Sequence, residues 1–299
     1  MPCSALRAAS ASVSGVVGTT NGHRPELATS LRDSSAADLL RGLGLRRTAP
    51  LLAGVARLAV GRFVADITEM DAAARDGLAA AAEVVLPRYS GTVTIRGGDQ
   101  VPASGPLVVV ANHAGTVDAP ALWRLLAARD DLRIIALERP ILRTIPNIAA
   151  RLLYVRDDAH GRTGLVRRAA EHLRSGGALL TFPAGTIEPD PVHRLDDAVA
   201  SLASWGPAVE LLVRLAPGTA VLPVGVAGVI SQRMLRHPLA RWRATPEDRE
   251  LAAATLQVLV QDRSIHPVVS AGALLDGRSG GELRAAMEHL LRDCVTERS

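Results

Sequence analysis

The sequence has no lysine and very few aromatic residues. All 34 basic residues of the 299 are arginines, and phenylalanine, tryptophan and tyrosine together make up only 2%. A hydrophobic core must therefore be built from leucine, valine, isoleucine and alanine, and a chain of this length can bury one large domain. Stacking on aromatic side chains cannot be a main means of recognition, which argues against binding of single-stranded nucleic acid.

Cysteines and long apolar runs are also scarce. The two cysteines, Cys3 and Cys294, lie near opposite ends and lack the spacing of metal ligands, so we expect neither a metal site nor a disulfide framework. No uncharged apolar run reaches about 18 residues, and the first residues lack the apolar segment of a secretory signal. We therefore expect a cytoplasmic protein without a membrane-spanning helix.

The excess of positive charge is small. The formal net charge is +4, and the arginines are spread along the chain without a long basic run. Such a balance suits attraction to anionic headgroups or acidic substrates better than binding to duplex nucleic acid. We therefore expect no nucleic-acid partner.

The chain divides by its residue pattern into three parts. Residues 1–48 are rich in small and polar residues without a sustained period, so we expect a disordered or weakly structured tail with at most one short helix near Ala36–Leu43. Residues 49–86 are predicted to form two helices, the first with an apolar stripe over Leu51–Phe63. This amphipathic element either lies in a membrane interface or packs on the core. Residues 87–299 are predicted to form one α/β domain.

Within that domain, short apolar runs alternate with helical patterns. Such an order is typical of a mixed β-sheet flanked by helices, which is the fold class that we predict. The predicted strands are Thr92–Arg96, Leu107–Ala111, Leu132–Leu137, Ala178–Phe182, Val221–Val226 and Leu256–Val260. The predicted helices are Ala119–Arg129, Thr163–Arg174, Asp196–Arg214 and Glu282–Arg292.

The strand predicted at Leu107–Ala111 leads into a turn that contains His113, and Asp118 follows where the next helix begins. Such strand-to-helix turns are where α/β proteins place their sites. A carboxylate at this spacing can reach back to one imidazole nitrogen and leave the other free to accept a proton from a hydroxyl. The spacing alone fits equally a histidine at a strand end and an aspartate at a helix start.

Four ordered segments carry more information than this pair. They are Asn112–Asp118, with Asn-His, four residues and Asp, then Tyr154–Arg156, Phe182–Thr186 and Val221–Val224. Together they resemble the glycerophospholipid acyltransferases typified by 1-acylglycerol-3-phosphate acyltransferase, over about residues 90–230. The resemblance implies the glycerol-3-phosphate acyltransferase-like α/β fold. It also implies His113 as general base, Asp118 as its orienting partner and Asn112 in the substrate-binding set.

The second segment keeps two of the family's three features. Tyr154 and Arg156 match the outer positions, while Val155 replaces an acidic residue. Arg156 resembles the family arginine that meets the acceptor's phosphate, a task that suits the paired donors of a guanidinium. The alternative is a surface arginine paired with Asp157 or Asp158.

The third segment resembles the family's Phe-Pro-Glu-Gly-Thr-Arg. Its matching residues, assigned to substrate binding, are Phe182, Pro183, Gly185 and Thr186. The backbone amides of Gly185 and Thr186 are candidate donors to the oxyanion of the tetrahedral intermediate.

Two positions of the third segment depart from the family. Ala184 replaces the glutamate and Ile187 replaces the arginine, which leaves the acceptor open. Glu188 either supplies a displaced carboxylate for substrate binding or belongs to a solvated acidic turn.

The resemblance implies direct transfer of a fatty acyl group from acyl-CoA or acyl-ACP to a lipid hydroxyl, with 1-acylglycerol-3-phosphate as the acceptor that the family suggests. A positioned imidazole is needed because an alcohol is a poor nucleophile at neutral pH. Beyond the thioester co-substrate no cofactor or metal is expected. The expected partners are a membrane lipid and the membrane surface, with the protein peripheral on the inner face of the cell membrane.

Three alternatives remain open at this point. The same chemistry could serve another acceptor, such as a glycolipid, an aminolipid or a natural-product hydroxyl. The chain could be a catalytically idle lipid-binding relative. Water could replace the lipid, which would make the reaction a thioester hydrolysis.

Overall fold

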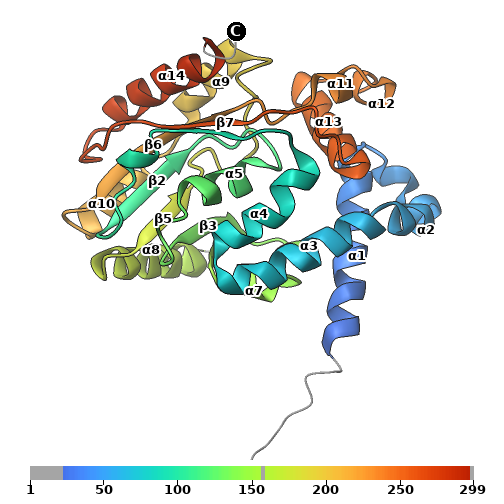
Figure 1. Ribbon diagram of the computed structural model, residues 1–299, viewed down its shortest axis with the longest axis horizontal. Coiled ribbons are helices and arrows are strands. Elements are labelled where there is room, and N and C mark those ends of the chain that lie inside the picture. Colours follow the sequence, from blue (N-terminus) through green and yellow to red (C-terminus); the bar gives the residue numbers. More distant parts are fainter. Residues whose placement is uncertain (1–22, 156–158, 297–299) are drawn as a thin grey trace, which may run out of the picture.

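The computed structural model describes residues 23–155 and 159–296. Within them, seven strands form one sheet in the order β1-β7-β6-β2-β5-β3-β4 (Figure 1). Neighbouring strands run parallel except β6 and β7, which are antiparallel. Helices cover the sheet, so the predicted class of a mixed sheet flanked by helices, preceded by a helical N-terminal region, is confirmed.

The strands lie close to most of the predicted positions. They are β1 (Thr94–Arg96), β2 (Leu107–Ala111), β3 (Arg133–Leu137), β4 (Leu152–Val155), β5 (Ala178–Thr181), β6 (Ala220–Ala227) and β7 (Val268–Ala271). The central strand β2 is fully buried along its length, as expected of a parallel strand covered on both faces. Its carboxyl end therefore opens from the middle of the sheet.

The helices form two layers, each defined by the core cluster that its helices join, and the two faces of the sheet contribute to different clusters. The first layer, with the N-terminal helices, comprises α1 (His23–Gly42), α2 (Ala49–Ala59), α3 (Gly61–Ala73), α4 (Leu78–Tyr89), α5 (Asp118–Leu125), α6 (Pro140–Arg143), α7 (Pro146–Ala149), α11 (Gln232–Leu235), α12 (Pro238–Arg241) and α13 (Pro246–Val260). The second comprises α8 (Ala159–Arg174), α9 (Leu195–Ser201), α10 (Ala208–Leu215) and α14 (Gly280–Thr296). Alternate residues of β2 pack against each: Val109 lies in the first core cluster and Val108 in the second.

The N-terminal part is more ordered than its composition suggests. Residues 1–22 lie outside the described residues, but α1 and a short 3-10 helix occupy much of the segment that we expected to be a weakly structured tail. Leu31, Ala36, Leu39 and Leu40 are buried in the first core cluster. The helix packs against α2, α3, α6 and α13. Its stability comes from these partners, which a local reading of small and polar residues does not reveal.

The prediction of a strand at Leu256–Val260 is wrong. This run is the last turn of α13, whose start is marked by Thr245 at the N-cap, with its hydroxyl accepting a hydrogen bond from the Asp248 amide at 3.1 Å, and by Pro246 in the first turn. Short apolar runs fit either a strand or a buried helix, and here the upstream helix start decides. The strand actually formed is β7, which the sequence analysis did not predict.

Two helical segments are divided more finely than predicted. The segment 49–86 contains α2, α3 and the start of α4 rather than two helices, and the predicted helix Asp196–Arg214 is interrupted at Gly206–Pro207, between α9 and α10. Proline lacks the amide donor that a continuous helix needs, which accounts for the interruption. Among the described residues no single helix is long and apolar enough to cross a membrane; the pair Leu195–Ser204 and Ala208–Leu215, bent by 51°, meets the length and composition criteria together.

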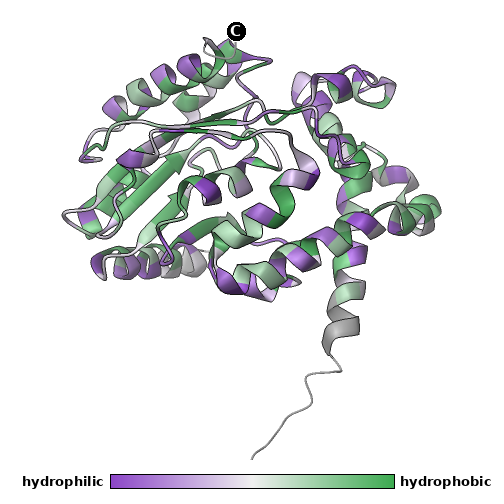
Figure 2. Cartoon of the chain, in the orientation of Figure 1, coloured by the Kyte–Doolittle hydropathy of each residue, from purple (hydrophilic) through white to green (hydrophobic). Residues whose placement is uncertain are grey.

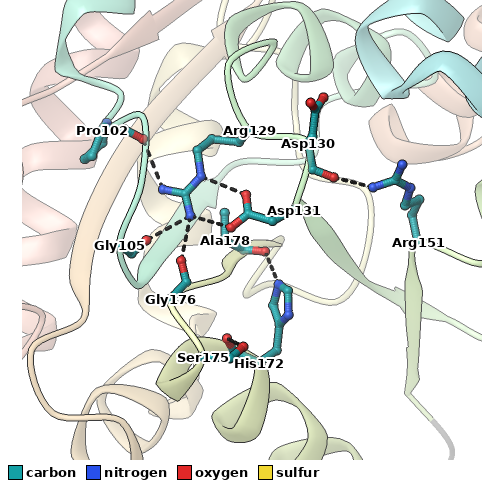
Figure 3. A network of polar contacts seen from close by, with 10 residues as sticks. All are labelled: Pro102, Gly105, Arg129, Asp130, Asp131, Arg151, His172, Ser175, Gly176 and Ala178. Atoms are coloured by element: carbon teal, nitrogen blue, oxygen red, sulfur yellow. Dashed lines mark hydrogen bonds and ion pairs between the residues drawn. The ribbon is translucent and has the colours of Figure 1, made fainter.

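A buried arginine ties together loops at the edge opposite the carboxyl end of β2. The side chain of Arg129 is 1% exposed and pairs with Asp131 through its Nε at 2.8 Å (Figure 3). It also donates to the carbonyls of Pro102, Gly105 and Gly176 at 2.8–3.1 Å. Because the guanidinium has several donors in a fixed plane, a single side chain holds three loops.

We expect Arg129→Ala to lower the free energy of unfolding by about 3 kcal/mol, because three carbonyls and a carboxylate lose a charged donor. Chemical denaturation monitored by circular dichroism measures the change. Arg151→Ala is the matched control, since Arg151 is a less buried arginine in the same region that donates to a single carbonyl, that of Asp130 (Figure 3). The control should change stability by less than about 1 kcal/mol. Equal losses in the two variants would contradict the role of Arg129.

Candidate functional site

The site lies where β2 ends and α5 begins. Ala111 is the last residue of β2, and Asp118 is the first residue of α5. The intervening turn carries His113, whose side chain is 32% exposed, whereas that of Asp118 is only 1% exposed. A buried carboxylate thus lies beneath a partly exposed imidazole at the carboxyl edge of the central strand.

His113 and Asp118, which the sequence pattern pairs, are in direct contact. Nδ1 of His113 lies 2.7 Å from Oδ2 of Asp118. The same carboxylate accepts hydrogen bonds from the Gly115 amide at 3.0 Å and the Ala119 amide at 2.6 Å. Because the carboxylate oxygen that faces the ring acts as a hydrogen-bond acceptor, this contact favours a proton on Nδ1. We therefore assign the Nε2 atom of neutral His113 as a proton acceptor.

The surroundings of His113 raise the pKa of its ring. Burial alone lowers its pKa, but the charge of Asp118 and its hydrogen bond outweigh burial, and the charge of Glu188 adds to them. The pKa is consequently raised above its ordinary value, although Arg139 opposes the shift. A raised pKa makes Nε2 a stronger base and stabilises the imidazolium that proton abstraction would form.

Glu188 lies beneath the turn rather than in an open acceptor site. Its carboxylate accepts from the His113 amide at 2.9 Å, and its own amide donates to the His113 carbonyl at 2.6 Å. Its other oxygen accepts from the Ser201 hydroxyl at 2.8 Å and from the Trp205 indole at 2.9 Å. The side chain is buried, and both carboxylate oxygens accept hydrogen bonds from the protein, so Glu188 positions His113. This arrangement differs from both alternatives expected from the sequence, a carboxylate that binds the substrate and an acidic turn in solvent.

Asn112 also has a structural contact set. Its amide group donates to the Val226 carbonyl at 2.8 Å and accepts from the Val226 amide at 2.8 Å. The side chain is buried and continues the pairing of β2 with β6 beyond the end of the ladder. Both functional groups of the amide are used inside the protein, which sets Asn112 apart from the substrate-binding role expected from the sequence.

The third segment forms a turn against the histidine. The ring of Phe182 lies 4.6 Å from that of His113 at an angle of 32°. Pro183 follows, and Gly185 adopts a left-handed backbone with φ of 65°, where a Cβ would be strained. The Gly185 amide donates to the Phe182 carbonyl at 3.0 Å, so it does not serve as a free oxyanion donor in this conformation. The hydroxyl of exposed Thr186 donates to the Ile187 carbonyl at 3.0 Å.

Arg156 lies outside the described residues. The strand β4 that leads to it ends at Val155 and pairs with β3. Arg139 is an exposed residue that follows β3, and its charge acts on His113. Its signal in the sequence was its place just after a predicted strand, at the same edge of the sheet as the histidine.

A third buried carboxylate at this edge, which the sequence did not assign to the site, is Asp190. It accepts from the amides of Gly228, Val229 and Ile230 at 2.7–2.8 Å, and from that of Val192 at 3.0 Å. A Cβ at Gly115 would meet the Val229 side chain at 3.0 Å, so the loop that Asp190 holds packs directly on the histidine turn. The only sequence signal was an acidic residue between Pro189 and Pro191.

Among residues 23–155 and 159–296, no group of three or more histidine, cysteine or acidic side chains is arranged to hold a metal ion.

Comparison with known proteins matches residues 92–227 to the family described as Acyltransferase. That segment contains β1 through β6 and the histidine turn. No curated protein matches the chain. Among solved structures, the chain is similar to the 1-acyl-sn-glycerophosphate acyltransferase PlsC from Thermotoga maritima, with 17% identity, a TM-score of 0.41, and coverage of 92% of this chain and 96% of the other.

We expect Glu188→Gln to lower the pKa of His113, because the negative charge of Glu188 helps to raise it. Asp118→Asn should lower it further, since the charge and hydrogen bond of Asp118 contribute more. Titration of the His113 ring by NMR measures both shifts. Glu171→Gln, on an exposed side chain of α8, is the control and should leave the titration unchanged. A rise in the pKa on removal of either carboxylate would contradict the electrostatic account.

Proposed function

We propose a reaction for this chain on the premise that it is an enzyme of the acyltransferase family, with its family domain at residues 92–227. In this reaction a fatty acyl group passes from the thioester of acyl-CoA or acyl-ACP to the hydroxyl of a membrane lipid. The observation that carries the proposal is the contact between His113 and the buried Asp118 at the end of β2. It supplies a base of raised pKa at a partly exposed position inside the matched segment.

The proposed chemistry needs one base that later acts as an acid. Nε2 of His113 takes the proton from the acceptor hydroxyl while that oxygen attacks the thioester carbonyl. The tetrahedral intermediate then breaks its carbon–sulfur bond, and the imidazolium returns the proton to the departing thiolate. The products are an ester and a free thiol, with no acyl-enzyme. Asp118 stabilises the imidazolium throughout, and Glu188 fixes the backbone from which the ring extends.

The proposed acceptor is 1-acylglycerol-3-phosphate, with Arg156 as the group that binds its phosphate. The alternative is another hydroxyl, and Ile187 favours it specifically. This side chain replaces a family arginine and is 44% exposed, five residues after Phe182, which lies against the His113 ring. With an apolar side chain at this position, the positive charge that would pair with an acceptor's phosphate is missing. A glycolipid, an aminolipid or a natural-product hydroxyl remains a candidate for that reason.

We expect His113→Ala to lower the rate of acyl transfer by about 10²- to 10⁴-fold, because the base is lost. Purified protein is incubated with a labelled acyl thioester and separate lipid acceptors, and both labelled lipid and released thiol are measured. A labelled product from 1-acylglycerol-3-phosphate identifies the first acceptor, whereas one from another lipid identifies the alternative. Thiol release without labelled lipid would indicate hydrolysis.

His193→Ala is the matched control for the reaction. Nε2 of His193 contacts the Ile230 carbonyl at 2.8 Å rather than a carboxylate, so this variant tests whether loss of any half-buried histidine gives the same effect. It should retain transfer at a rate above that of His113→Ala. Membrane binding without any thiol release from the unsubstituted protein would favour the catalytically idle relative.

The protein is further proposed to be peripheral on the inner face of the cell membrane, with α2 as the contact. Three large apolar side chains of α2 point outward: Leu51 is 84% exposed, Val55 66% and Leu58 83%. Ala56 on the same helix is buried, so α2 has one face on the protein and one free of it. Figure 2 shows the hydrophobic colouring of α2 at the side of the molecule away from the sheet. An apolar helix face of this kind suits burial in a bilayer interface.

We expect Leu51→Gln with Leu58→Gln to weaken binding to lipid vesicles by at least about tenfold, because two apolar side chains no longer leave water. Vesicle flotation measures binding, and transfer to a water-soluble acceptor analogue checks that the site is intact. Leu274→Gln, at an exposed leucine outside the N-terminal helices, is the control. Unchanged flotation of the double variant would rule out α2 as the contact.

A further inference from the structure

A second exposed apolar surface lies on the hairpin formed by α11 and α12, residues 232–242. Trp242, directly after α12, is 79% exposed, and Leu239 within the helix is 41% exposed. The other two tryptophans, Trp123 and Trp205, are buried at 6% and 4% exposure. In a protein with so few aromatic residues, an indole left in solvent is the exception, and an indole suits the boundary between water and lipid.

The hairpin holds these side chains in place. Met234 and Ala240 are buried in the first core cluster, and α11 and α12 both pack on α13. The backbone amide of Trp242 donates to the Pro238 carbonyl at 2.9 Å, which fixes the residue at the end of the helix. The exposure of Trp242 therefore reflects a supported surface rather than a frayed chain end.

The hairpin is also rich in positive charge. Arg233, Arg236 and Arg241 are exposed. In the part of the chain that the structure describes, Arg236 and Arg241 form no ion pair, whereas the nearby Arg243 pairs with Asp248 at 3.2 Å. An indole and a leucine side chain flanked by guanidinium groups without ion pairs are complementary to a lipid bilayer, which is apolar inside and carries anionic headgroups at its surface.

This hairpin and α2 are joined through the same part of the protein. A Cβ at Gly44, in the loop between α1 and α2, would meet the Arg243 side chain within 1.5 Å, so residue 44 lies directly beside the residue that follows Trp242. Figure 1 places α11, α12 and α2 on the same side of the molecule, away from α8, α10 and α14. If both α2 and the hairpin contact a bilayer, they restrict how the protein is oriented on it, whereas contact through α2 alone leaves the protein free to tilt.

We propose that Leu239 and Trp242, with Arg236 and Arg241, form a second docking surface for an anionic lipid bilayer. The inference rests on the proposed membrane association of α2. Trp242 enters the interface when α2 does, and the two contacts together set how the protein sits on the bilayer. The negative headgroups pair with the two arginines, while the indole and the leucine side chain leave water.

The fluorescence of Trp242 tests this directly, because the other two tryptophans are already buried. The full chain is mixed with vesicles of phosphatidylcholine, with and without phosphatidylglycerol. Emission should shift to the blue on binding, and lipid brominated on its acyl chains should quench it. Trp242→Phe should remove both signals while retaining flotation, which assigns them to this residue.

Arg236→Gln with Arg241→Gln should weaken binding to the anionic vesicles by about fivefold for each arginine and leave binding to neutral vesicles unchanged. Arg278→Gln with Arg292→Gln, at exposed arginines near α14, is the matched control and should bind as the unsubstituted protein does. High salt should reduce the difference between the two vesicle types.

The outcomes separate this inference from the proposed role of α2. Vesicle binding without a blue shift or quenching of Trp242 would overturn the second surface and leave α2 as the contact. No flotation of the unsubstituted protein would overturn membrane association altogether. A blue shift that appears without lipid as protein concentration rises, together with a dimer in sedimentation, would overturn the proposal by assigning the surface to a second copy of the chain.

Discussion

Three carboxylates must remain buried at the carboxyl edge of the sheet, and the local structure is built around satisfying them. Asp118, Glu188 and Asp190 are each at most 4% exposed. Each accepts hydrogen bonds from backbone amides of neighbouring loops, which compensates for the loss of water. The same bonds that satisfy these charges set the path of the chain around His113. The hydrogen bonds that make burial of the carboxylates possible are therefore the ones that fix the loops around His113. The charges of Asp118 and Glu188 also act on the histidine.

Much of the fold could be predicted because its strands are continuous apolar runs bounded by turn residues. Leu107–Ala111 was identified to the residue, since a short continuous apolar run between turn residues is the pattern of a strand buried on both faces. The errors fell where local pattern was ambiguous. Leu256–Val260 is as apolar as a strand, but the helix that begins at Pro246 continues through it. The burial of α1 depends on α13, more than two hundred residues later, and no local pattern contains that information.

The site was predictable to the same extent. The pairing of His113 with Asp118 was expected from their spacing together with the resemblance of four ordered segments to a family, and the contact is present. The positions of Asn112 and Glu188 were noticed, but their partners were not, because the partners lie on β6 and on the segment after α9. Motif residues that look like substrate contacts in a linear sequence can instead be the ones that hold a loop. Only the folded contacts distinguish the two.

The packing of α1 against α13 has a consequence for the order in which the protein is made. The helices at the amino end leave the ribosome first, whereas α13 emerges only after most of the chain has been synthesised. Leu31 and Leu40 are buried in the core cluster that α13 completes, so part of their covering is missing until then. For that interval the nascent chain exposes the inward face of α1 as well as the outward leucines of α2. If translation takes place close to a lipid surface, the lipid would cover the outward leucines of α2, while the inward face of α1 stays exposed until α13 has been synthesised.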